Sequence, residues 1–169
     1  DHPLVAQAQK ANGALTDALS AALSNPETPS DVRAAIINTL GWHIEGKINA
    51  AAYLEYLAGT HKLSVTKLSL ADLAPQESFA LGYLLAMDHY SDLSPIGSTI
   101  KGDSGPLTKL TPQEILADAV ARAPQDFTVA LIQSLVWAQQ AMDSDWCLVF
   151  KQVDQVIKKP WPVRNMKDQ

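Results

Sequence analysis

Apolar residues return at every third or fourth position along most of this chain, and this period constrains its fold more than any other feature. Residues at that spacing share one face of an α-helix. The first such stripe consists of Ala8, Ala11, Leu15, Leu19 and Ala22. The spacing recurs over residues 32–40, 48–57, 79–90, 127–142 and 146–157. The pattern therefore predicts an all-α protein.

Prolines and capping residues mark where the helices begin and end. Thr111 and Glu114 form a capping-box pattern that predicts a helix running to Arg122. Further helices are predicted to start near Pro75 and Pro124. Gly59 is predicted to cap the end of the helix before it, because Gly commonly follows a helix end. These signals predict about seven helices packed as antiparallel helical hairpins, in a bundle or a short helical-repeat array.

Two stretches lack a helical period. Residues 60–74 are expected to form an extended connector, since a single short strand would have no partner. Residues 91–110 are expected to form one long irregular loop, and loops of that length are often functional. We predict one helical domain over 1–159 and a C-terminal tail over 160–169.

Composition narrows the classes of function. The 169 residues carry a net charge of −5 with scattered Lys and Arg, which argues against nucleic-acid binding. No apolar run reaches the roughly 18 residues of a membrane span. The first residue is Asp1 and not Met, so we expect that something upstream was removed. The single Cys147 does not settle the compartment, and both export (periplasmic or secreted) and a cytoplasmic location stay open.

Two segments resemble each other within the chain. "AIINTLGW" (35–42) and "ALIQSLVW" (130–137) match at four positions and are similar at three more. Each follows a Pro-x-Asp start and precedes another helix with an apolar face. One interpretation is a short stack of helical repeats that presents a binding surface. The alternative is a chance similarity between amphipathic helices rich in Ala and Leu.

The run from Gly102 to Pro106 resembles the sequence around the nucleophile of chymotrypsin-type serine proteases. That resemblance would make Ser104 a nucleophile and would imply a fold of two β-barrels. The family has a second Gly before the Pro, which this chain lacks, and a chain patterned as helices cannot supply the barrels. We therefore interpret the run as a turn, because Asp, Ser, Gly and Pro all favour turns.

His43, Asp88, His89 and Asp92 are the candidates for a small-molecule or metal site. Asp88 and Asp92 share a helix face, and His89 lies one step round from it. If the loop at 42–46 folds against that helix end, His43, His89 and Asp92 could converge. Metal sites in helical bundles usually take ligands three or four residues apart on one helix. Asp88 and His89 are adjacent and diverge, so hydrogen-bonded or solvated histidines are the favoured interpretation. No residue is assigned as a metal ligand.

Trp42 and Trp161 complete the candidate binding residues. Trp161 lies between two prolines, and we favour its packing onto the helices over a role as a partner's anchor. The leading hypothesis is a non-enzymatic helical interaction or scaffolding module whose partner is another protein or a second copy. The alternative is a small-molecule or metal-binding helical protein, with hydrolase activity as one option, that uses His43, Asp88, His89 and Asp92. No catalytic residue is assigned and any cofactor stays unidentified.

Overall fold

The computed structural model describes residues 2–41, 48–98, 105–142 and 144–166, and these ranges contain helices and no strand. This confirms the predicted all-α class. The α-helices are α1 (Pro3–Lys10), α2 (Asp17–Ser24), α3 (Ser30–Leu40), α4 (Asn49–His61), α5 (Pro75–Asp88), α6 (Pro112–Arg122), α7 (Phe127–Gln139) and α8 (Trp146–Lys158). Three 3-10 turns are η1 (Leu70–Asp72), η2 (Ile96–Ser98) and η3 (Leu107–Lys109).

The first predicted helical stripe is divided between two helices, so the described ranges hold eight α-helices where about seven were expected. Asn12 and Gly13 have φ angles of 50° and 83°. Such left-handed residues end α1, and Thr16 then caps α2 by accepting the Leu19 N–H. The apolar spacing continues across the break, which is why periodicity alone joined the two helices.

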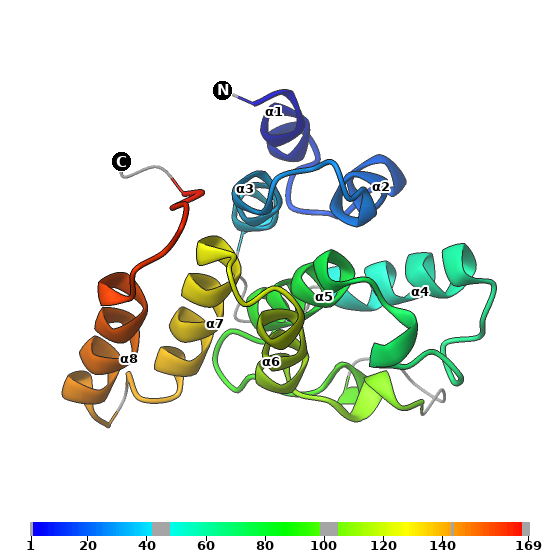
Figure 1. The fold of residues 1–169 in the computed structure, drawn as a ribbon. Helices are drawn as coiled ribbons and strands as arrows, with labels where there is room; N and C mark the ends of the chain where they lie inside the picture. Colours follow the sequence, from blue (N-terminus) through cyan, green and yellow to red (C-terminus); the bar gives the residue numbers. More distant parts are fainter. Residues whose placement is uncertain (1, 42–47, 99–104, 143, 167–169) are drawn as a thin grey trace.

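Helix α5 forms the centre of the molecule (Figure 1). Eleven of its fourteen residues are buried, and it packs against α2, α3, α4, α6 and α7. A helix that is apolar on all sides belongs in the middle of a core. The apolar stripe predicted over residues 79–90 agrees, since Phe79 is fully buried and Met87 is nearly so.

Helix ends follow the capping residues where the local signal is strong. Thr111 accepts the Glu114 N–H at 3.3 Å, and the Glu114 carboxylate accepts the Thr111 N–H at 2.8 Å, which confirms the capping box. The expected end at Gly59 is wrong. Helix α4 continues to His61, and Lys62 takes the left-handed conformation with a φ of 55°.

The two similar segments lie mainly in α3 and α7, which pack against each other. Leu40 is buried, whereas Leu135 at the matching position is exposed. Trp42 lies outside the described residues. The internal repeat stays a prediction.

Helices α7 and α8 form a hairpin at one edge of the molecule (Figure 1). The segment after α8 contacts the start of α7. Asn165 accepts the Thr128 N–H there at 3.0 Å, and Met166 packs against the apolar cluster around α7. The tail that begins after the predicted boundary at residue 159 therefore contacts the helices.

Candidate functional site

Asp88 joins the end of α5 to the start of α4. Its side chain is buried, and its Oδ2 accepts the Ala50 N–H at 2.7 Å. Ile48, which precedes α4, supplies no side-chain cap. A carboxylate at a helix N-terminus satisfies a free N–H and complements the helix dipole. Asp88 thus caps α4 from another helix.

His89 and Asp92 lie next to Asp88 in a looser arrangement. The His89 Nδ1 is 3.7 Å from the Asp92 Oδ1, and Asp92 is exposed. Hydrogen bonds from Ser94, led by its hydroxyl, lower the pKa of Asp92. The structure therefore brings three of the four candidate residues to one helix end. His43, the fourth, lies outside the described residues, as do Trp42 and Ser104.

The described part of the chain holds no group of three or more His, Cys, Asp or Glu residues that could bind a metal ion. His61 and Glu77 form a polar pair that the sequence did not indicate. Their Nε2 and Oε2 atoms are 3.0 Å apart, and the same Glu77 oxygen accepts the Ala74 N–H at 2.8 Å. This buried carboxylate thus ties the end of α4 to the start of α5.

Trp161 packs onto the last two helices. Its indole N–H donates to the Val156 carbonyl at 2.7 Å, and its ring meets Phe127 edge-to-face with centroids 5.6 Å apart. The Lys159 ammonium lies 4.2 Å from the centroid of the indole. These contacts agree with the favoured interpretation that Trp161 packs onto the helices.

Helix α8 carries the largest exposed apolar side chains. None of its residues is buried, although eight of its thirteen residues are apolar. Val149, Val153 and Val156 are half-buried at spacings of four and three, and they form the stripe nearest α7. Beside them stand Trp146, Phe150 and Ile157, which we call the α8 face.

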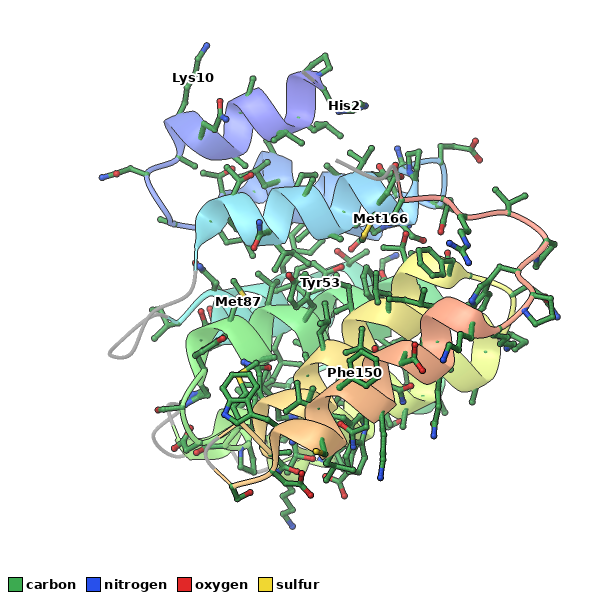
Figure 2. All side chains as sticks on the ribbon, turned by 90° about the vertical axis from the view of Figure 1, so that its left-hand side faces the viewer. His2, Lys10, Tyr53, Met87, Phe150 and Met166 are labelled. Carbon is green, nitrogen blue, oxygen red and sulfur yellow. The ribbon has the colours of Figure 1, made fainter. Side chains whose placement is uncertain are left out.

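The α8 face is open to solvent. Trp146 is 69% exposed and Phe150 67% exposed, and Ile157 is also exposed. In Figure 2, where α8 faces the viewer, Phe150 lies in front of the α8 ribbon on the outer side of the molecule. Further exposed apolar side chains on or near this hairpin are Leu135, Trp137, Leu148 and Val163.

The polar border of the α8 face is basic. Lys158 pairs with Asp154 at 2.7 Å. Lys151 is exposed and pairs with no carboxylate of the described residues. Along residues 151–158, two ammonium groups thus stand beside one carboxylate that is already paired, while the Asp145 carboxylate lies at the helix start and accepts the Leu148 N–H.

The sequence predicted the apolar stripe of residues 146–157 but not its exposure. The stripe has the same spacing as those that pack into the core, so the residues alone do not reveal which stripe is left uncovered. The one local signal is that residues 160–169, which follow the stripe, have no helical period of their own.

Comparison with known proteins finds no family model, no curated protein and no solved structure that matches this chain. Within the described ranges, no helix combines the length and the apolar character that crossing a membrane requires.

Proposed function

We propose that this protein is a non-enzymatic interaction module that binds an amphipathic helix of another protein on the α8 face. The supporting observation is the exposure of Trp146 and Phe150 on a helix that buries none of its residues. Scattered exposed hydrophobic residues are ordinary on protein surfaces. Three large side chains in one helical stripe are a feature of interaction sites.

The residue types fit that role. Trp is among the residues that contribute most to binding energy when a partner covers them, and Phe is enriched in interfaces. The stripe formed by Trp146, Phe150 and Ile157 has spacings of four and seven, which suit a partner helix lying along α8.

The charges indicate the chemistry of the partner. Lys151 and Lys158 border the face, and among the described residues only Lys158 has an acidic neighbour within ion-pair distance. A partner helix with Glu beside its apolar stripe would complement this border, while one with Lys would be repelled. A second copy of this chain with its α8 parallel to this one would instead place Lys151 and Lys158 close to their own counterparts.

The test uses two synthetic helical peptides with the same Leu stripe, one flanked by Glu and the other by Lys. Binding is followed by Trp fluorescence, because Trp146 would leave water in the complex. We expect the Glu peptide to bind more tightly than the Lys peptide. Phe150→Ser should weaken the binding of the Glu peptide at least about tenfold, as loss of a buried aromatic anchor does.

Leu63→Ser is the matched control, since Leu63 is an exposed apolar residue on another part of the surface. It should leave peptide binding unchanged. Equal binding of both peptides, or unchanged binding by Phe150→Ser, would contradict the proposal. So would sedimentation that shows a dimer lost in Phe150→Ser, or binding to anionic phosphatidylglycerol vesicles that the same variant abolishes.

A further inference from the structure

Three helices, α3, α5 and α7, begin around one small pocket. The pocket has a volume of about 180 Å³. Ser30 is the first residue of α3, Gln76 the second of α5, and Asp126 the N-cap of α7, and all three line it. Helix N-termini carry partial positive charge, so their convergence favours an anion.

Arg33 supplies a full positive charge to this pocket. Its side chain lines the pocket and is only 3% exposed. Its Nε donates to the Leu23 carbonyl at 2.9 Å, and its Nη2 donates to the Asn25 carbonyl. Nη1 donates to no acceptor among the described residues, and no carboxylate there lies within 4.0 Å of the guanidinium.

A buried guanidinium without a direct ion pair is unusual, because burial of a charge is unfavourable unless it is paired. Burial lowers the pKa of Arg33 accordingly. Asp126 lines the same pocket and its negative charge partly offsets the effect of burial, but the guanidinium makes no ion pair within 4.0 Å with its oxygens. They accept hydrogen bonds from the Ser30 hydroxyl, the Val129 N–H and the Asn165 amide.

A second hollow adjoins the pocket. It shares Ala123 and Asp126 with the pocket, is shallower and more open, and has a volume of about 480 Å³. Pro124 and Val163 line it. An apolar group attached to an anion in the pocket would have an apolar surface to lie on.

We propose that the Arg33 pocket binds the carboxylate of a small organic acid whose apolar chain lies in the adjoining hollow. The planar guanidinium matches the geometry of a carboxylate. The Asp126 carboxylate, which also lines the pocket, disfavours a dianion such as hydrogen phosphate, because a second negative charge adds to the repulsion between the ligand and this carboxylate. This site is separate from the α8 face and does not depend on it.

The test is a titration followed by two-dimensional ¹H–¹⁵N NMR at constant ionic strength, with hexanoate, acetate, phosphate and chloride as probes. Hexanoate should give saturable shifts at the Arg33 Nε–H and at the amides of Ser30 and Gln76. Acetate should shift the same signals with severalfold weaker affinity, because each buried methylene adds apolar contact. Phosphate and chloride should give no saturable shift there.

Two variants test the assignment. Arg33→Lys keeps the positive charge but loses the planar guanidinium with its paired N–H donors. It should weaken the affinity for hexanoate at least about tenfold. Since Arg33 also holds two carbonyls, Ala123→Phe is the second variant; it fills the boundary of the pocket and the hollow without removing any polar group. It should abolish hexanoate binding while the NMR spectrum stays that of a folded protein.

Lys10→Gln, which removes an exposed charge on α1, should leave hexanoate affinity unchanged, and so should Phe150→Ser. The proposal is overturned if hexanoate gives no saturable shift at these signals, or if phosphate binds as tightly as hexanoate. It is overturned equally if the folded Ala123→Phe variant binds hexanoate like the unsubstituted protein.

Discussion

The hydroxyl of Ser30 donates to the Oδ2 of Asp126 at 2.6 Å, across a separation of 96 residues in the chain. This bond ties the first residue of α3 to the N-cap of α7. The other carboxylate oxygen accepts the Val129 N–H at 3.1 Å and the Asn165 amide at 2.9 Å. One aspartate therefore holds together α3, α7 and the segment that follows α8.

Replacement of Asp126 by Ala should destabilise the protein by about 2 kcal/mol or more, because it removes a helix cap and two further charge-assisted hydrogen bonds. Ser30→Ala should cost about 1 kcal/mol. In the double variant the two losses should be less than additive, since both remove the same bond. Urea unfolding measures all three. Ser91→Ala, on an exposed turn, is the control. Strict additivity would show that the two side chains are not coupled.

Gly82 and Gly59 should respond oppositely to Ala. A Cβ at Gly82 would lie 2.8 Å from the Leu116 Cγ, at the contact between α5 and α6. Gly82→Ala should therefore cost about 1–3 kcal/mol through overpacking. A Cβ at Gly59 would meet nothing within 4 Å, so Gly59→Ala should stabilise α4 by about 0.5–1 kcal/mol. Thermal unfolding distinguishes the two, and a stable Gly82→Ala variant would mean that α6 can shift.

The capping box of α6 should make a small contribution to stability that depends on pH. Hydrogen bonds from Thr111, the backbone N–H first and then the hydroxyl, lower the pKa of Glu114 below its usual 4.5. A lowered carboxylate pKa contributes stability that is present above the unfolded pKa and is lost as pH falls through the folded one. The difference in unfolding free energy between the unsubstituted protein and Glu114→Gln should thus be constant near neutrality and shrink below about pH 4.5.

Thr111→Ala removes the other half of the box and should cost about 1 kcal/mol at neutral pH. Thr66→Ala is a suitable control because Thr66 is exposed outside the helices. If the Glu114→Gln difference grew on acidification, the carboxylate would not be the stabilising partner.

Two tyrosines should make the protein sensitive to alkali. Burial raises the pKa of Tyr53 above its usual value, and burial raises the pKa of Tyr83 to about 12. A raised phenol pKa gives stability that is complete below the unfolded pKa near 10 and is lost as pH rises toward the folded value. The ultraviolet absorbance of ionised tyrosine should show two groups that ionise only at pH values well above 10, together with unfolding.

Tyr83→Phe should remove part of this alkaline loss with little change at pH 7. Tyr53→Phe should also cost about 1 kcal/mol at pH 7, because the Tyr53 hydroxyl is hydrogen-bonded to Ser24 at 2.9 Å. Ionisation of all tyrosines near pH 10 in the folded protein would contradict the prediction.

The candidate residues show how far local pattern reaches. The apolar stripe on residues 146–157 and the position of Trp161 were predictable, because both depend on neighbours within a few residues. The role of Asp88 was not, since the N–H that it accepts belongs to Ala50 on another helix. Arg33 gave no signal either: its position in an amphipathic helix is compatible with an exposed charge.

The sequence by itself determined that this chain is helical and where most helices begin, because period and capping act over three or four residues. The tertiary structure alone decided that α5 lies at the centre, that the α8 face is uncovered, and that Arg33 is buried at a meeting of three helix starts. These properties depend on which helix covers which, and that is set by the joint packing of side chains far apart in the chain, such as Ser30 with Asp126.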